Sequence, residues 1–200
     1  MTEEINQNDL VASEIAANPE LIKPVIEDLY DASRTKRQRA SEIVSNVAHA
    51  NIDILIPHIS DLTDALNRPE AKTRWGVLDA LNLMVSAESR QCDKALVGAE
   101  SSLFDEKNGP VRLAAFRFLC SLGATTPARS EKIWPLLSDA ISCYHGDFEY
   151  TEMLAIFSVF ADGKIADSVK ADIVKTLSFD AKNAKGSIGK RTKSIVDKLS

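Results

Sequence analysis

The stretch RLAAFRFL at residues 112–119 has the same order of small and large residues as RWGVLDAL at residues 74–81. Both start with arginine, carry a small residue at the third position, and place large apolar residues at the fifth and eighth positions. A third copy starts at Arg37, so successive copies begin 37 and 38 residues apart. Because a unit of this length cannot bury its apolar face alone, the period predicts an architecture of stacked repeats.

The same spacing extends the repeat towards the C-terminal end of the chain. It reaches Tyr150 and then the region of Gly189, where two weaker copies are found. Apolar residues recur at i, i+3, i+4 and i+7 and no strand-like alternation is sustained, which predicts an all-α protein. We expect an N-terminal capping helix within residues 1–18, followed by a single repeat domain over residues 19–200. The expected antiparallel helix pairs are about five, at residues 19–50, 51–87, 88–124, 125–162 and 163–200.

Prolines recur in the first helix of several pairs. PVIEDL at 24–29 returns as PHISDL at 57–62 and as PLLSDA at 135–140. A proline inside a helix removes one backbone donor and clashes with the preceding turn, at a cost of ~3 kcal/mol or more, and kinks the axis. The repetition therefore predicts a shared structural role, a bend in the first helix of the pair.

These features resemble the HEAT repeat family, within the wider group of HEAT and armadillo α-solenoids. The resemblance is carried by the Pro-x-(Ile/Leu)-x-Asp-(Leu/Ala) stretches and by NGPVRLAA at residues 108–115. It implies a right-handed α–α superhelix in which the second helix of each pair, the B helix, lines a concave surface. It also implies that arginines at the start of the B helices join neighbouring repeats through Asp or Asn side chains.

The helical period predicts which side chains form the core. Gly76, Ala114 and Ala115 are expected to let helices approach closely. The three cysteines are far apart in the sequence and are expected to be small buried hydrophobes rather than disulfide or metal ligands. The large residues expected in the core are Leu29, Ile59, Leu62, Leu78, Leu81, Leu96, Leu103, Phe116, Leu119, Leu137, Ile141, Leu154, Phe157, Ile173 and Leu177.

Composition and motifs disfavour several classes of function. The chain has 200 residues and a net charge of −5, and its N-terminus, MTEEINQNDL, lacks the basic and apolar regions of a secretory signal. Apolar runs are too short to span a membrane, so we expect a cytoplasmic protein. No phosphate-binding glycine loop or nucleophile motif is present, and the histidines have no metal-ligand spacing. We therefore predict no catalytic residue, no cofactor and no metal.

Charge differs between the two classes of helix. The expected B segments, 34–49, 69–86, 109–123, 147–161 and 185–199, hold 13 basic and 7 acidic residues, or +6. The rest of the chain holds 11 basic and 22 acidic residues, or −11. Two interpretations stay open: an electropositive binding surface, or arginines that are partly structural beside an ordinary solvated surface.

The leading hypothesis is a non-enzymatic scaffold or adaptor whose B-helix surface binds an acidic or extended segment of a partner protein. Electrostatic complementarity mainly sets the encounter rate and the choice of partner. Large aromatic side chains often anchor such contacts. The candidate contact residues are Lys36, Lys72, Trp75, Arg117, Lys190 and Lys193.

The alternative is binding of a nucleic-acid phosphate backbone, as the resemblance to HEAT-like alkylpurine DNA glycosylases implies. Steeply salt-dependent DNA binding would support it. The net acidity and the acidic fourth repeat weigh against it, and no aspartate here matches a catalytic residue of that group. A lyase-like role, as in HEAT-repeat proteins that attach bilins, is supported only by the repeat itself.

Overall fold

The computed structural model describes residues 7–200, in which all regular structure is helical. Residues 1–6 of the expected capping region lie outside this range. The chain divides into two compact units, the first ending at Ala115 and the second comprising Phe116–Ser200, with the boundary inside helix α7 (Gly109–Gly123). Within residues 7–200, no helix combines the length and apolarity that crossing a bilayer requires.

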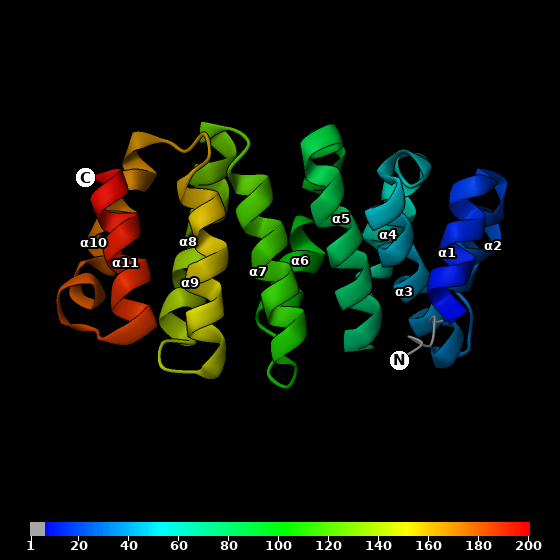
Figure 1. Cartoon of the computed structure of the whole chain (residues 1–200), viewed down its shortest axis with the longest axis horizontal. Coiled ribbons are helices and arrows are strands. Elements are labelled where there is room, and N and C mark those ends of the chain that lie inside the picture. Colours follow the sequence, from blue (N-terminus) through cyan, green and yellow to red (C-terminus); the bar gives the residue numbers. More distant parts are fainter. Residues whose placement is uncertain (1–6) are drawn as a thin grey trace, which may run out of the picture. The chain divides into compact units, whose positions relative to one another are not determined.

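Unit 1 contains three helices that run next to one another in one layer, α1 (Gln7–Ala17), α3 (Arg34–Ala50) and α5 (Ala71–Cys92). Shorter helices pack against this layer (Figure 1). They are α2 (Ile22–Asp28), α4 (Ile59–Ala65) and α6 (Leu96–Leu103), and 3₁₀ turns at Pro19–Leu21, Ile56–His58 and Asp93–Ala95 precede them.

Unit 2 repeats the two-layer arrangement. Helix α8 (Pro127–Cys143) packs against α10 (Asp167–Asn183), while α9 (Phe148–Ala161) packs against α11 (Gly186–Leu199). Helices α10 and α11 also contact each other extensively (Figure 1). The B helices therefore follow the expected segments to within a residue or two, except that α5 continues to Cys92.

Only one of the three repeated prolines lies in the middle of a helix, as the sequence predicted for all three. Pro135 lies inside the continuous helix α8, as expected. Pro57 is the second residue of the 3₁₀ turn Ile56–His58. Pro24 is the third residue of α2, and that helix begins directly after the 3₁₀ turn Pro19–Leu21. The prediction of a mid-helix kink is therefore wrong for Pro24 and Pro57. At the start of a helix the missing backbone donor would have had no partner in any case, so proline is tolerated there.

The core agrees with the helical period. All fifteen large residues expected in the core are buried, and so are Ala114 and Ala115. Gly76 permits the close approach of α5 to α3, because a Cβ atom at this position would lie 2.6 Å from the main-chain oxygen of Ser41. Cys92 and Cys120 are buried, but Cys143 is exposed, so the expectation for that cysteine is wrong. It is the last residue of α8, where the helix emerges into solvent.

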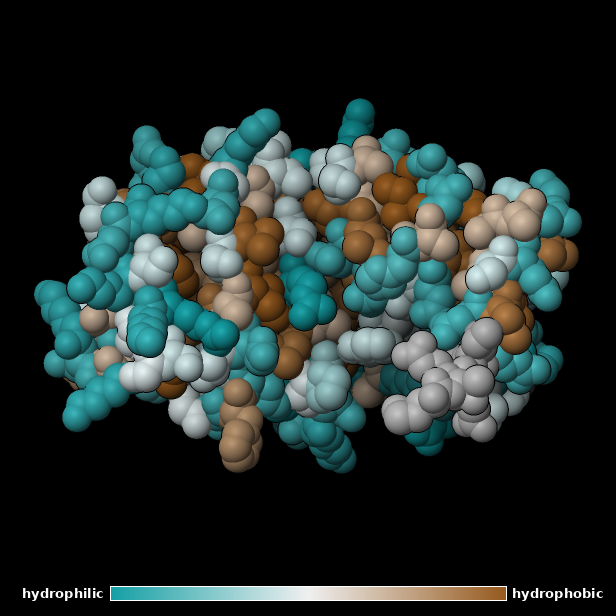
Figure 2. All heavy atoms as spheres, in the orientation of Figure 1, coloured by the Kyte–Doolittle hydropathy of each residue, from teal (hydrophilic) through white to brown (hydrophobic). Residues whose placement is uncertain are grey.

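Figure 2 shows which apolar residues remain at the surface on one face of the molecule. Apolar residues are visible in patches, and hydrophilic residues surround them. Scattered apolar exposure of this kind is normal for a folded protein, so single exposed residues need a pocket or a charge pattern beside them to indicate a site.

Candidate functional site

Arg37, in α3, joins two consecutive turns of unit 1. Its Nε and Nη2 atoms both donate to the carboxylate of Glu70, the residue before α5, with Nε at 3.3 Å. Its Nη1 atom donates to the main-chain oxygens of Asp31 at 2.6 Å and Ala32 at 2.9 Å. The hydrogen bond from Arg37 holds the pKa of Glu70 below its usual value, so this carboxylate stays ionised.

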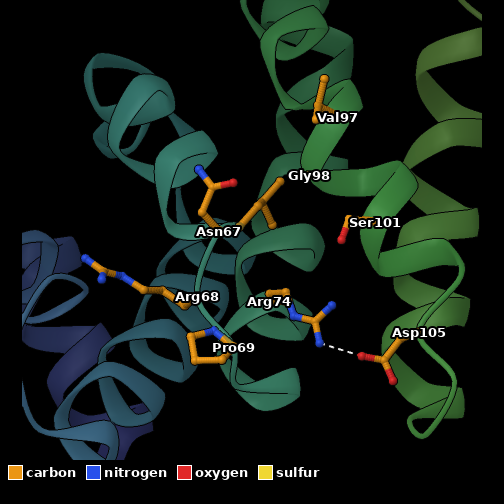
Figure 3. A pocket seen from close by; sticks show the side chains of 9 residues that line it. Asn67, Arg68, Pro69, Arg74, Val97, Gly98, Ser101 and Asp105 are labelled. Atoms are coloured by element: carbon orange, nitrogen blue, oxygen red, sulfur yellow. Dashed lines mark hydrogen bonds and ion pairs between the residues drawn. The ribbon is translucent and has the colours of Figure 1, made fainter.

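Arg74 repeats the arrangement one helix pair further along the chain. Its Nη2 atom donates to Asp105 Oδ2 at 2.5 Å (Figure 3). Its Nη1 atom donates to Ser102 Oγ at 3.4 Å. Burial by itself would raise the pKa of Asp105, but the hydrogen bonds from Arg74 and Asn108 outweigh burial and hold this pKa well below its usual value. We call these contacts between neighbouring repeats the arginine ladder. The expected Asp partner is confirmed for Arg74, whereas Arg37 binds the carboxylate of Glu70 instead of an Asp or Asn side chain.

In unit 2 a tyrosine, not an arginine, forms the corresponding contact with a carboxylate. Tyr150 stands where the other copies have arginine, and its hydroxyl donates to Asp180 Oδ2 at 2.5 Å. His145 Nε2 lies 3.0 Å from the same oxygen, and its ring centre lies 4.7 Å from that of Tyr150. Burial, followed by the bond to Asp180, raises the pKa of the Tyr150 hydroxyl. The hydroxyl therefore remains a neutral donor.

The ladder reduces the positive charge that the B helices can offer to a ligand. The guanidinium groups of Arg37 and Arg74 are nearly buried, with side chains only 12% and 10% exposed, and each is paired with a carboxylate. Any basic binding surface in unit 1 must therefore rest on other residues.

A cavity of about 500 Å³ lies beside Arg74, between the segment Leu66–Pro69 and helix α6 (Figure 3). The Arg74 side chain reaches across it to Asp105, while Arg68 points away from it and lies over the ring of Tyr30, 5.2 Å from its centre. The facing charges of Arg74 and Asp105 cancel, so we assign this cavity to the ladder rather than to a charged ligand.

Trp75 lines a smaller pocket on unit 1. Its side chain is 38% exposed, whereas Trp134 is 6% exposed and packs on Phe157 and Phe160. The pocket has a volume of about 240 Å³ and lies between the first turns of α5 and α7. Its lining residues are Ala71, Lys72, Trp75, Asn108, Pro110 and Val111.

A second pocket of about 440 Å³ continues the first towards α3. The two share Ala71, Lys72 and Asn108, so they form one surface groove across the first turns of α3, α5 and α7. The second pocket adds Arg34, Gln38, Pro69 and Glu70. Arg34 is exposed and makes no hydrogen bond or short ion pair within residues 7–200. We call this surface, with both sets of lining residues, the Trp75 groove.

Two of the predicted contact residues, Lys72 and Trp75, thus lie in one groove. Lys72 Nζ forms an ion pair of 2.8 Å with Glu42 while its side chain remains 52% exposed. Lys36 does not line the groove: it pairs with Asp31 at 2.8 Å and with Asp28 at 3.9 Å near the end of α2.

The other predicted contacts are exposed cations of unit 2. Arg117 lies on α7, and Lys190 and Lys193 lie one turn apart on α11. None of the three makes a hydrogen bond or ion pair within residues 7–200.

Sequence analysis missed Arg34, Gln38 and Asn108 as lining residues of the groove. In the sequence, Asn108 is only the first residue of the NGPVRLAA stretch at 108–115, and Arg34 is one of several basic residues in the segment 34–49. The repeat alignment offers a signal, because all three lie at the starts of B helices, close to the position of the ladder arginine. The described residues contain no group of three or more His, Cys, Asp or Glu side chains that could hold a metal ion.

Comparisons with known proteins identify the fold through structural similarity alone. No protein-family model matches the chain, and no curated protein matches it in sequence. The fold is nevertheless that of a helical-repeat protein of the HEAT and armadillo type.

The similar solved structures include natural and designed repeat proteins. A designed armadillo repeat protein in complex with the peptide (KR)₄ aligns with a TM-score of 0.73 at 19% identity, over 94% of this chain and 90% of that one. Computationally designed armadillo repeat proteins for modular peptide recognition align with a TM-score of 0.72 at 17% identity, over 96% and 92%. An archaeal HEAT-like repeats protein from Thermococcus onnurineus aligns with a TM-score of 0.57 at 14% identity, over 96% and 92%.

Proposed function

We propose that this protein is a non-enzymatic interaction scaffold that binds an extended, acidic segment of a partner protein in the Trp75 groove. The observation that carries the proposal is the partly exposed Trp75, which lines an apolar pocket opening into a groove that also holds Arg34 and Lys72.

Trp75 supplies the anchor in this proposal. Tryptophan is enriched among residues that dominate binding energy, because it offers a large rigid surface for little loss of conformational entropy. The pocket of about 240 Å³ is small, and Pro110 and Val111 form its far wall. We therefore expect it to hold one apolar side chain of the bound segment.

Arg34 and Lys72 favour acidic side chains beside that anchor. Within the groove, both hydrogen bonds to the Glu70 carboxylate come from Arg37, and Arg34 interacts with that carboxylate only through the weaker Coulombic attraction that helps to lower its pKa. The pair between Lys72 and Glu42 is partly exposed, and pairs of this kind contribute little. Lys72 can therefore exchange Glu42 for a carboxylate of the ligand, and Lys36 is proposed to act in the same way.

Arg117, Lys190 and Lys193 are proposed as separate partner contacts on unit 2, because none of them makes a hydrogen bond or ion pair within residues 7–200. The structural comparisons support a peptide as the class of ligand, because one similar designed protein holds a peptide and another group was designed for peptide recognition. The peptide (KR)₄ named for the first is basic, so the preference for acidic residues rests only on the groove of this chain.

Phosphate-backbone binding has less support. Contacts with nucleic acid require several free cations along one surface. In unit 1 Arg37, Arg74, Lys36 and Lys72 all have carboxylate partners, which leaves Arg34 as the unpaired cation among the described residues of the groove.

The proposal is tested by calorimetric titration with two peptides, an acidic one in which alternating Asp and Glu flank a central leucine, and (Lys-Arg)₄. We expect the acidic peptide to bind and to weaken as salt is added, because screening reduces exposed charge interactions. Tighter binding of the basic peptide, or no binding of either, would refute the preference for acidic partners.

Variants locate the binding site. Trp75→Ala should weaken acidic-peptide binding by about tenfold or more, which corresponds to ~1.4 kcal/mol. Arg34→Glu should also weaken it, whereas Lys175→Glu, which changes the net charge equally at an exposed position of α10, should have a much smaller effect. Equal losses for the two charge reversals would show that only net charge matters.

A further inference from the structure

Phe148, the first residue of α9, is the most exposed large apolar side chain in residues 7–200. Its relative exposure is 101%, compared with 76% for Val97 and 72% for Phe179. Phe179 belongs to the same end of unit 2, because its neighbour Asp180 bonds to Tyr150 in the first turn of α9. Such exposed aromatic side chains indicate a contact surface where a pocket or a charge pattern lies beside them.

A pocket of about 340 Å³ opens directly beside Phe148. It lies between the first turns of the adjacent helices α9 and α11 and is lined by Gly146, Asp147, Phe148, Thr151 and Ile188. The main-chain oxygen of Thr151 accepts a hydrogen bond from Arg191, which ties the two helices together beneath the pocket. A projecting phenylalanine thus lies next to a hollow that can receive one.

The residues that precede the two helices bordering this pocket carry opposite charges. Asp147 precedes α9 and Lys185 precedes α11, both are exposed, and neither side chain caps its helix. A partner with one sign of charge would be attracted on one side and repelled on the other. A surface with the same acid and base in exchanged positions would be attracted on both.

We propose that a second copy of this chain docks here about a two-fold axis, with Phe148 of each copy in the pocket of the other. The axis places Asp147 of one copy opposite Lys185 of the other, twice. Because the two-fold axis brings the same surface of both copies together, the contact is isologous and closes at two copies instead of forming an open chain. This surface belongs to unit 2 and is independent of the Trp75 groove.

Sedimentation analysis of the full chain over a range of concentrations tests the proposal. The wild type should show a monomer–dimer equilibrium with no larger species. Phe148→Ala should raise the dimer dissociation constant at least tenfold, while Val97→Ala, the matched exposed control in unit 1, should leave it unchanged. A wild type that stays monomeric at high concentration, or a Phe148→Ala variant that dimerises like the wild type, overturns the proposal.

A charge exchange gives the sharper test. Asp147→Lys and Lys185→Glu should each abolish self-association, because each homodimer would bring like charges together twice. An equimolar mixture of the two variants should dimerise again, since the introduced lysine of one copy would face the introduced glutamate of the other. Circular dichroism checks that both variants are folded. If the folded variants fail to associate when mixed, the two-fold arrangement is wrong.

Discussion

Replacing Arg74 by leucine should destabilise the protein by about 2–3 kcal/mol. The Arg74 and Asp105 side chains are only 10% and 14% exposed, and breaking a buried ion pair from one side typically costs ~3–5 kcal/mol. Two features make the expected loss of stability for Arg74→Leu smaller than this typical cost. Asp105 keeps hydrogen bonds from Asn108 Nδ2 and Lys107 N, both 2.9 Å long, and the Nε atom of Arg74 is already buried without an acceptor in the described residues.

The partner variant makes the prediction specific. Asp105→Asn should also destabilise, because it leaves the guanidinium without its counter-ion. The double variant Arg74→Leu/Asp105→Asn should recover part of the loss, with a coupling free energy of about 1–2 kcal/mol, since neither charge then remains buried and unpaired.

Urea denaturation of the wild type and the three variants measures these differences from the midpoints and slopes. Lys23→Ala serves as the control, because the Lys23–Glu20 pair is solvent-exposed on both sides and its loss should leave the midpoint unchanged. Additivity of the two single changes to within about 0.3 kcal/mol would contradict the ladder as a stabilising device.

Other contacts and the exposure of single side chains predict further effects on stability and on thiol reactivity. Gly76→Ala should destabilise by about 1–2 kcal/mol despite the better helix propensity of alanine, because its Cβ would meet a main-chain oxygen of α3 at 2.6 Å. Tyr150→Phe should cost about 1–2 kcal/mol by leaving a buried carboxylate with one donor fewer. In the native protein a thiol reagent should modify Cys143 alone, and all three cysteines only after denaturation. Stability should fall in acid: the pKa of Asp105 is lowered by folding, so its contribution is complete above its unfolded pKa of about 4 and is lost as the pH falls towards its folded value.

Each of these outcomes has a clear opposite. A stabilised Gly76→Ala variant would mean that α3 and α5 are not in close contact. An unchanged denaturation midpoint for Tyr150→Phe would show that the hydrogen bond between Tyr150 and Asp180 does not stabilise unit 2. Rapid native labelling of more than one thiol would contradict the burial of the other two cysteines. An Asp105→Asn variant with the same acid sensitivity as the wild type would assign that sensitivity to other carboxylates.

The helical core was predictable because burial follows the period of the helix. Leu78, Leu119 and Phe157 occupy the same stripe in different copies, and each is buried as expected. The position of Tyr150 followed from the stride alone, although its sequence neighbours differ from those of Arg37 and Arg74. Its bond to Asp180 shows that the stride located a structural position correctly where residue identity had changed.

The local backbone was less predictable. Pro24 and Pro57 were expected inside helices, but 3₁₀ turns precede or contain them. Whether a segment forms a 3₁₀ turn or an α-helix depends on its local hydrogen bonding, which the spacing of apolar residues does not specify. Helix α5 is interrupted at Glu88, where φ is −134° and ψ is 46°, a detail that the apolar spacing does not specify.

Charge counts proved a weak guide to the candidate site. The excess of basic residues in the B segments includes Arg37 and Arg74, which are paired internally, and Lys36 and Lys72, which have partners on neighbouring elements. Pairing depends on which acidic groups the fold brings within reach, and the sequence alone does not show this. The Trp75 groove could not be predicted from the sequence for the same reason, since its lining residues come from three helices.

Amide chemical-shift mapping by NMR tests the central claim most directly. The wild-type protein is titrated with the acidic peptide that contains a central leucine. We predict saturable shifts concentrated at residues 34–38, 71–75 and 108–111, and their loss in Trp75→Ala. Saturable shifts confined to other segments, or shifts that persist unchanged in Trp75→Ala, would contradict the assignment of the binding site to the Trp75 groove.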